Sequence, residues 1–262
     1  MTTLELTDRG VPSQHTRTIT LGGLPIAVID RQAEAELMIR LAARRRPQGP
    51  LFFTSANGEV IARTAFDPAQ AALFAPADQI VADGQPLVIA SRLLCREPLP
   101  ERVATTDLFH DVARLAETTG TSFYFFGATE AENARALAAA RAAYPRLNIV
   151  GASHGYLDGD ALDAKLAEID ALAPDILWLG LGVPREQLFF RDHGHKLRHV
   201  GLIKTSGGLF DHMAGKVRRA PLAWQRLGFE WLWRLLMEPR RLFVRYLTTN
   251  PKALFAILRN SR

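Results

Sequence analysis

Residues 122–150 read SFYFFGATEAENARALAAARAAYPRLNIV, and this stretch carries the pattern that decides the fold. The aromatic run Ser122–Phe126 is typical of a buried strand and ends at Gly127. The alanine-rich segment Glu130–Ala143 predicts a helix, and the apolar run Leu147–Val150 predicts the next strand. A strand, a helix and a second strand within about thirty residues form the unit that joins neighbouring parallel strands.

The same alternation continues on both sides of this stretch. The other expected strands are short apolar runs: Ile26–Ile29, Leu51–Thr54, Gln79–Ala82, Asp175–Leu179 and Val200–Lys204. The other expected helices cover Arg31–Arg46, a segment from about Asn57, Asp107–Glu117, Asp160–Leu172 and a segment opening at Pro184. Alternation over about 190 residues predicts an α/β fold with a mostly parallel sheet flanked by helices.

Composition excludes several classes of protein. The 262 residues are 48% hydrophobic and 23% charged, which is typical of a globular chain and not of a disordered one. A single cysteine, Cys95, rules out an intramolecular disulfide framework and favours a reducing compartment. No apolar stretch approaches the about 20 residues of a spanning helix, and Met1–Gly10 lacks the apolar core of a signal peptide.

The charge is concentrated at one end of the chain. Residues 213–262 contain 11 Lys and Arg but only Glu230 and Glu238 as acids, a net charge of +9, whereas residues 1–212 have a net charge of −4. We therefore expect three parts: a polar flexible arm (1–17), an α/β domain (18–212) and a basic, aromatic, helical appendage (213–262).

The appendage combines arginines with three of the four tryptophans. On one ideal helix, five arginines would fall within an arc of about 100°: Arg219, Arg226, Arg234, Arg241 and Arg245. Pro239 is expected to break such a helix. Three interpretations stay open: the appendage lies at a membrane interface, binds nucleic acid, or is a helical cap whose arginines face water.

Polar residues follow several expected strands, where α/β proteins bind ligands. They are Ser55–Asn57, Asp83–Gly84, Gly127–Thr129, Gly180–Gln187 and Thr205–Gly208. Asp83 could act as a general base on a hydroxyl group, or Asp83–Gly84 could simply form a turn. Asn57 could orient a substrate or cap the following helix, and capping is favoured.

The loop Gly180–Gln187 reads GLGVPREQ and joins a strand to a helix. Its backbone N–H groups could bind the diphosphate of a nucleotide, or the glycines could only form a tight turn. It matches neither the Walker loop nor the dinucleotide-binding fingerprint. The histidines His193, His195 and His199 lack the spacing of zinc ligands, so solvated histidines are the favoured interpretation.

Two runs near the end of the chain resemble a known family. Residues 206–221 read SGGLFDHMAGKVRRAP and residues 227–241 read LGFEWLWRLLMEPRR. They resemble the WecG/TagA/CpsF family, glycosyltransferase family 26, which also shows T-x-N, A-D-G and G-x-P-x-Q-E blocks upstream. Here these blocks are Ser55-Ala-Asn57, Ala82-Asp-Gly84 and Gly182–Gln187, and the resemblance spans about residues 22–250.

The sequence departs from the family pattern at two places. Ser55 replaces the usual threonine but keeps the hydroxyl group. Glu186-Gln187 reverses the usual Gln-Glu order, which changes the side chain that would face a ligand at each position.

The resemblance implies a Rossmann-like, inverting glycosyltransferase that needs no metal and no other cofactor. It implies a nucleotide-sugar donor, commonly UDP-linked, and a polyprenyl-diphosphate-linked sugar as acceptor. The sugar moved would be an N-acetylhexosamine, hexose or uronic acid, used for exopolysaccharide or another cell-surface polymer. The enzyme would be cytoplasmic and peripheral at the inner face of the bacterial cytoplasmic membrane, with residues 213–262 on the anionic surface.

The resemblance also implies roles for individual residues. Asp83 would be the catalytic base, with Ser55 and Asn57 in the same pocket. The expected donor-binding residues are Gly84, Gly127, Gly180, Gly182, Pro184, Gln187 and Gly208. The acceptor's diphosphate would meet arginines that match its oxygens: Arg102, Arg218, Arg219 and Arg226.

Two other functions stay open from the sequence. A non-catalytic protein could bind nucleic acid through the basic tail, and binding of an oligonucleotide with a steep salt dependence would reveal it. A nucleotide-sugar-modifying enzyme such as an epimerase is the third hypothesis, and the missing dinucleotide-binding fingerprint argues against it. A homo-oligomer is neither predicted nor excluded.

Overall fold

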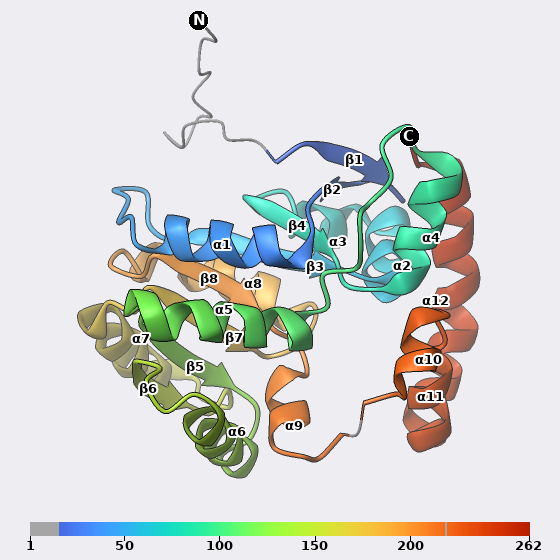
Figure 1. Ribbon diagram of the computed structural model, residues 1–262. Coiled ribbons are helices and arrows are strands. Elements are labelled where there is room, and N and C mark those ends of the chain that lie inside the picture. Colours follow the sequence, from blue (N-terminus) through green and yellow to red (C-terminus); the bar gives the residue numbers. More distant parts are fainter. Residues whose placement is uncertain (1–15, 218) are drawn as a thin grey trace, which may run out of the picture.

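The computed structural model describes residues 16–217 and 219–262, except the side chains of Leu222, Arg226 and Arg241. In this part of the chain, six parallel strands form the central sheet in the order β4-β3-β8-β7-β5-β6 (Figure 1). They are β3 (Leu51–Ala56), β4 (Gln79–Ala82), β5 (Phe123–Gly127), β6 (Ile149–Ser153), β7 (Ile176–Gly180) and β8 (Leu202–Thr205). The predicted α/β fold with a mostly parallel sheet is confirmed.

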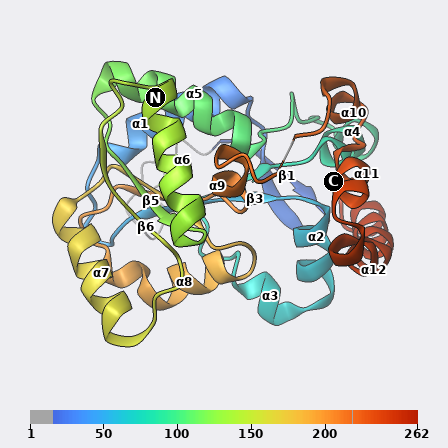
Figure 2. The same cartoon turned by 90° about the horizontal axis from the view of Figure 1, so that it is seen from below.

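Helices cover both faces of this sheet. They are α1 (Arg31–Ala42), α5 (Thr105–Thr119) and α6 (Glu130–Ala143) on one face, and α7 (Gly159–Leu172) and α8 (Arg185–His193) on the other (Figure 2). Because side chains on both faces of a central strand are buried, β5 and β7 are apolar along their whole length. This explains why short continuous apolar runs marked the strands in the sequence.

The first expected strand belongs to a separate hairpin and not to the parallel sheet. Strands β1 (Thr18–Leu21) and β2 (Leu24–Ala27) pair antiparallel around Gly22 and Gly23. Both glycines have positive φ angles, 59° and 91°, which a two-residue hairpin turn requires. Beside β3 and β4 the hairpin packs with α2 (Gly58–Phe66) and α4 (Gln85–Leu94), and with Leu73 and Phe74, which follow the short helix α3 (Pro68–Ala72).

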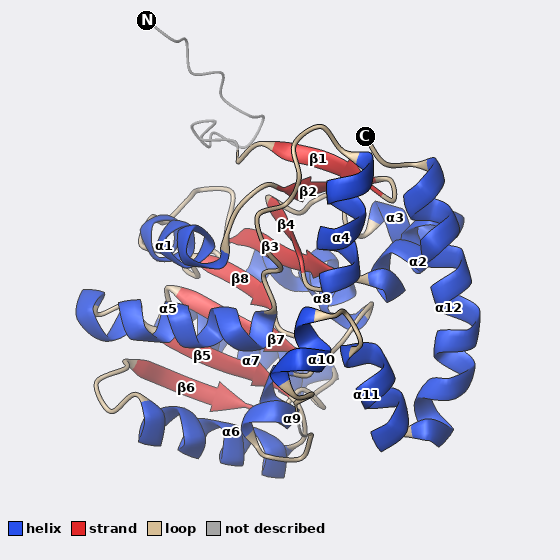
Figure 3. Ribbon diagram, turned by 45° about the vertical axis from the view of Figure 1, so that its right-hand side comes forward, coloured by secondary structure: helices blue, strands red, loops and turns tan. Residues whose placement is uncertain are grey.

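The strands point with their carboxyl ends toward the last helices of the chain (Figure 3). These helices are α9 (Leu209–Met213), α10 (Leu222–Arg226), α11 (Glu230–Met237) and α12 (Pro239–Arg259). The break expected at Pro239 is confirmed, since α11 ends at Met237 and Pro239 opens α12. The five arginines of the ideal-helix arc are divided among separate elements, so they do not share one helix face.

The last helix is tied firmly to the α/β body. Ala253, Ala256 and Ile257 of α12 are buried in one apolar cluster with α2, α4 and the hairpin. The backbone of Arg262 exchanges two hydrogen bonds with that of Thr20 in β1, at 3.2 and 2.9 Å. The helices also hold one another through aromatic pairs, such as Trp231 of α11 against Tyr246 of α12.

The expected flexible arm falls mostly outside the described residues, which begin at Thr16. Within the described part, the Arg17 carbonyl accepts a hydrogen bond from the Val28 N–H at 2.7 Å. The Arg17 side chain forms an ion pair with Glu97, also at 2.7 Å. Among the described helices, none combines the length and apolarity that crossing a bilayer requires.

Candidate active site

Two of the predicted catalytic residues meet where β3 and β4 end. The register pairs Ser55 with Val81 and Ala56 with Ala82, so Ser55 and Asp83 lie on adjacent strands at one edge. The Asp83 N–H donates to the Ala56 carbonyl at 2.8 Å, which continues the sheet past its last formal pair. Both side chains are half-buried, and the same edge faces the appendage.

The Asp83 carboxylate is held by Thr105 at the start of α5. Its Oδ2 accepts hydrogen bonds from the Thr105 N–H at 3.3 Å and from the Thr105 hydroxyl at 3.1 Å. Burial raises the pKa of Asp83, while the bonds from Thr105 and the charge of Lys204 oppose this rise and Glu230 adds to it. A carboxylate with a raised pKa at a ligand-binding edge suits a general base.

Lys204 is a residue of this edge that sequence reasoning missed. It lies in the middle of β8 with no exposed surface. Its Nζ donates to the Ser55 Oγ at 2.8 Å and to the Thr205 carbonyl at 3.0 Å. Burial lowers the pKa of Lys204, whereas Glu34, Asp83 and Glu186 favour its charged form.

Glu34 adds a second buried carboxyl group from α1. Its Oε2 accepts a hydrogen bond from the Gln79 amide at 2.6 Å, and its Oε1 is buried without a partner among the described residues. Burial raises the pKa of Glu34 to about 7, although Gln79 and Lys204 both act to lower it. The group is therefore poised to change its charge near neutral pH.

Glu186 ties together the loops that follow β7 and β8. Its Oε1 accepts hydrogen bonds from the N–H groups of Leu181 at 3.3 Å, Ser206 at 3.2 Å and Gly207 at 2.7 Å. These loops are the ones expected to bind a diphosphate through backbone N–H groups. Three of those groups thus already have an acceptor within the protein, supplied by the reversed Glu-Gln pair.

The Gln187 side chain contacts a strand of the sheet, β3, and not the loops that Glu186 joins. Its amide nitrogen donates to the Thr54 hydroxyl at 3.1 Å, and Thr54 in turn shares a hydrogen bond with Thr205 at 2.9 Å. The Gln187 side chain is buried and its Oε1 has no partner in the part of the chain that the structure describes. Its predicted donor-binding role stays a prediction.

The predicted donor-binding glycines and Pro184 lie along the carboxyl edge. Gly84 follows β4, Gly127 and Gly180 end β5 and β7, Gly182 and Pro184 precede α8, and Gly208 precedes α9. A Cβ atom on Gly127, whose φ is 146°, would lie 2.2 Å from the Gly180 carbonyl oxygen. Gly127 is therefore required for the close approach of two strand ends, whatever it does for a ligand.

Asn57 caps the helix that follows β3. Its Oδ1 accepts a hydrogen bond from the Val60 N–H at 3.1 Å, in the first turn of α2. The capping interpretation of Asn57 is confirmed. Asn57 is exposed and directly follows β3, at the same edge of the sheet as Asp83.

Two of the four predicted acceptor-binding arginines join the appendage to the edge. Arg102 donates to Glu230 of α11 at 2.6 Å, and Arg219 forms an ion pair with Asp107 of α5. The pKa of Arg219 is raised by Asp107 first, with further contributions from Glu230 and Asp83. Arg218 and the side chain of Arg226 lie outside the described part of the chain.

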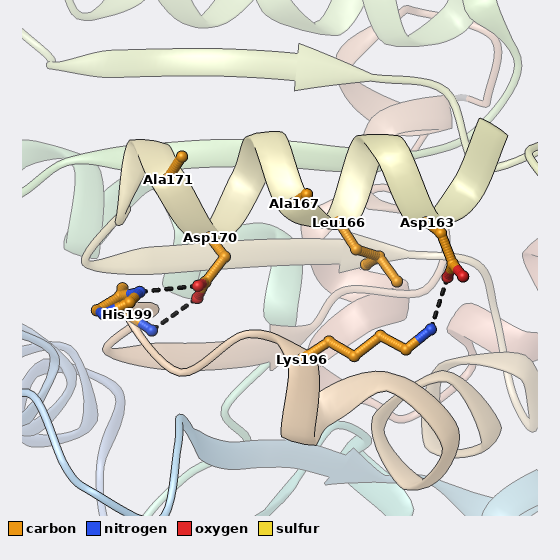
Figure 4. Close-up of a pocket in the computed structure, with 7 residues that line it drawn as sticks. All are labelled: Asp163, Leu166, Ala167, Asp170, Ala171, Lys196 and His199. Carbon is orange, nitrogen blue, oxygen red and sulfur yellow. Dashed lines mark hydrogen bonds and ion pairs between the residues drawn. The ribbon is translucent and has the colours of Figure 1, made fainter. Parts of the chain in front are cut away.

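A surface hollow between α7 and the segment Gly194–His199 is an unsuitable site. Lys196 and Asp163 pair at 2.6 Å, and His199 and Asp170 pair at 2.7 Å, so its charged groups satisfy one another (Figure 4). None of the motif residues lines it. Across the described residues, no three His, Cys, Asp or Glu side chains gather as they would around a metal ion.

The comparisons with known proteins identify the family. The model of a family described as "Glycosyl transferase WecG/TagA/CpsF family" matches residues 19–262. The chain belongs to the WecG/TagA/CpsF glycosyltransferase family. One similar protein is the N-acetylglucosaminyldiphosphoundecaprenol N-acetyl-beta-D-mannosaminyltransferase of Bacillus spizizenii, 33% identical over 214 residues, which are 80% of each chain.

As a WecG/TagA/CpsF protein, this chain is a glycosyltransferase, as its motifs predicted. The first two upstream blocks of the family pattern span the ends of β3 and β4, the third follows β7, and all three lie at one edge of the sheet. The residues missed in the sequence, Lys204, Thr105 and Glu34, come from elements that carry no such block. Only Lys204 left a signal, since a lysine ends an otherwise apolar expected strand.

Proposed function

We propose that the protein transfers a sugar from a UDP-linked donor to a sugar carried on polyprenyl diphosphate, with inversion at the anomeric carbon. Family membership supports the transfer reaction, and the name of the Bacillus relative, which specifies a diphosphoundecaprenol-linked acceptor, supports the acceptor class. The same name makes an N-acetylhexosamine the first donor sugar to test. The observation that carries the proposal is Asp83 at a sheet edge adjoining the basic appendage.

Asp83 is the proposed base. The acceptor hydroxyl oxygen attacks the anomeric carbon, its proton passes to the Asp83 carboxylate, and the bond from that carbon to the nucleotide diphosphate breaks. Attack from the face opposite the leaving group inverts the configuration. The raised pKa of Asp83, caused mainly by burial, makes the carboxylate a stronger base than an exposed aspartate.

Arg102 and the arginines of the appendage are the proposed partners of the acceptor's diphosphate. Arg102 and Arg219 lie at the junction of α5, α10 and α11 and are already bound by carboxylates of Asp107 and Glu230. A diphosphate is a doubly charged acceptor of the same hydrogen bonds, which guanidinium groups bind in pairs. Arg218 and Arg226 complete the proposed set, as the family pattern implies.

The outer surface of α11 and α12 is the proposed membrane-binding face. Among the described residues, ten of the fifteen exposed large apolar side chains fall between residues 227 and 258: Leu227, Phe229, Leu236, Met237, Phe243, Val244, Leu247, Leu254, Phe255 and Leu258. Exposed basic residues of α12, such as Arg240, Lys252 and Arg259, border them. Apolar and cationic side chains on one helix are typical of peripheral binding to anionic lipid.

The test of the proposed function is transfer by the full chain, with UDP-N-acetylhexosamines as donors and N-acetylglucosaminyl-diphosphopolyprenol as acceptor. The Asp83→Asn variant is expected to lower kcat by about 10²–10⁴-fold while UDP still raises the thermal unfolding temperature. Asp163→Asn, which alters only an exposed ion pair, is the matched control and should transfer at the wild-type rate. Near-wild-type transfer by a folded Asp83→Asn enzyme would show that the base is another group.

A further inference from the structure

The buried ammonium group of Lys204 lies at one end of a hydrogen-bond chain that reaches Asp83. Lys204 Nζ donates to Ser55 Oγ at 2.8 Å. Ser55 Oγ lies 3.3 Å from Thr105 Oγ1, and Thr105 Oγ1 donates to Asp83 Oδ2 at 3.1 Å. These four groups come from β8, β3, the start of α5 and the residue after β4. The hydrogen-bond chain therefore connects three adjacent strands and one helix.

The two ends determine the direction of every bond in this chain. An ammonium group can only donate and an ionised carboxylate can only accept. Because Ser55 accepts from Lys204, its own hydrogen is available to Thr105, and the Thr105 hydrogen is then directed at Asp83. Both hydroxyl groups are thus polarised toward the carboxylate, which is an arrangement that strengthens each bond.

The charges around the chain favour an ionised Lys204 together with an ionised Asp83. Glu34 of α1, Asp83 and Glu186 of α8 all favour the charged form of Lys204. Glu186 has three backbone donors of its own. Around Asp83, Glu230 of α11 acts against ionisation, whereas Lys204 and the more exposed Arg219 favour it.

We propose that Lys204 is a positioning residue which, through Ser55 and Thr105, keeps the Asp83 carboxylate ionised and correctly oriented to accept the proton of the acceptor hydroxyl. The proposal rests on the proposed role of Asp83 as the base. It also gives Ser55 a defined role, because the Ser55 hydroxyl transmits the polarisation from Lys204. The hydrogen of that hydroxyl is committed to Thr105 and is not offered to substrate.

The test measures the titration of Asp83 directly, by carbon-13 NMR of aspartate carboxyl groups in the folded full chain, with Asp83→Asn to assign the signal. Lys204→Met is expected to raise the Asp83 pKa by about one unit or more, because an opposite charge nearby is lost. Ser55→Ala should raise the Asp83 pKa less, since the charge of Lys204 stays and only the hydrogen-bond chain is interrupted. Ser55→Thr, which keeps the hydroxyl group, should leave it at the wild-type value.

The pH dependence of kcat/KM, measured in the same variants, separates this proposal from the proposed function. If the acid limb of the kcat/KM profile moves to higher pH in step with the Asp83 pKa, both the role of Lys204 and the role of Asp83 as the base are supported. A raised Asp83 pKa with an unmoved acid limb supports the role of Lys204 and contradicts Asp83 as the base. An unchanged Asp83 pKa in Lys204→Met overturns the role of Lys204, whatever the activity.

A matched double variant keeps the test decisive if Lys204→Met fails to fold. Lys204→Met with Glu34→Gln removes one buried cation and one buried carboxyl group together, so the number of unpaired buried charges does not increase. The expected rise in the Asp83 pKa is the same in direction. If the Asp83 pKa of the double variant equals that of Glu34→Gln alone, Lys204 has no effect on Asp83 and the proposal is wrong.

Discussion

Glu34 illustrates how one buried side chain couples the charge of the edge to the stability of the fold. It is fully buried on α1, and burial raises its pKa to about 7. An unfolded chain releases the same proton near pH 4.5. The folded protein therefore binds this proton more tightly, and the stability gained from it is complete below about pH 4.5 and is lost as the pH rises through about 7.

We expect the Glu34→Gln variant to reveal this loss. Relative to the variant, the wild-type protein should lose up to about 3 kcal/mol of unfolding free energy between pH 4.5 and about pH 8, at about 1.36 kcal/mol per unit of pKa shift. Chemical denaturation across this pH range measures the difference. Glu36→Gln removes an exposed carboxylate of the same helix and should show no such trend. A pH-independent gap between wild type and Glu34→Gln would refute the coupling.

At the scale of elements, the loops after β7 and β8 are joined by one side chain. Glu186 enters from the first turn of α8 and accepts three N–H groups from those loops. The loops carry Gly182 and Gly208, which are predicted to bind the donor. The shape of the predicted donor site therefore depends on a contact between a helix and two loops.

The Glu186→Ala variant is expected to unfold more easily and to bind UDP more weakly. Three N–H groups lose their acceptor, and the bond from the Ser206 N–H is a buried one. A buried unsatisfied donor costs about 1–3 kcal/mol, so a loss of about 2 kcal/mol is expected. Thermal and denaturant unfolding, with and without UDP, measure both effects. Asp163→Ala, which breaks an exposed ion pair with Lys196, should leave stability nearly unchanged because water screens that pair. Equal effects of the two variants would contradict this role of Glu186.

At the scale of the whole molecule, the last helix has two different sides. Ala256 of α12 is fully buried against the α/β body, whereas Leu254 and Leu258 are 60% and 63% exposed. The inner side fixes the helix to α2 and the hairpin, and the outer side presents apolar surface. The fold does not use this outer apolar side for its own core, so the side is available to contact a partner surface such as a membrane.

We expect Leu254→Gln with Leu258→Gln to weaken binding to anionic phospholipid vesicles about tenfold or more, since each leucine buried in lipid contributes about 1.5–3 kcal/mol. The unfolding temperature should change little, because both side chains are exposed. Vesicle co-sedimentation at several lipid concentrations measures the affinity. Leu172→Gln, at the exposed end of α7, is the control of equal charge. Unchanged binding by the double variant would show that α12 does not face the membrane.

Much of the fold was predictable because its signals are local in sequence. The strand Gln79–Ala82 and the helix Glu130–Ala143 were expected with the bounds observed. The helix expected over Arg31–Arg46 ends at Ala42, and the strand β1 was not expected at all. Helix ends and the pairing of short hairpin strands depend on tertiary contacts, here with the C-terminal residues, which no local pattern records.

By itself, the sequence determined the α/β class, the order of strands along the chain, the family motifs and the concentration of basic charge after residue 213. Apolar periodicity, turn residues and charge depend only on neighbours in the chain, so the sequence alone displays them. Only the tertiary structure decided that Lys204 reaches Ser55, 149 residues away, and that Thr105 joins Ser55 to Asp83. Such contacts follow from the spatial order of the strands, and a side chain's charge state follows from what then surrounds it.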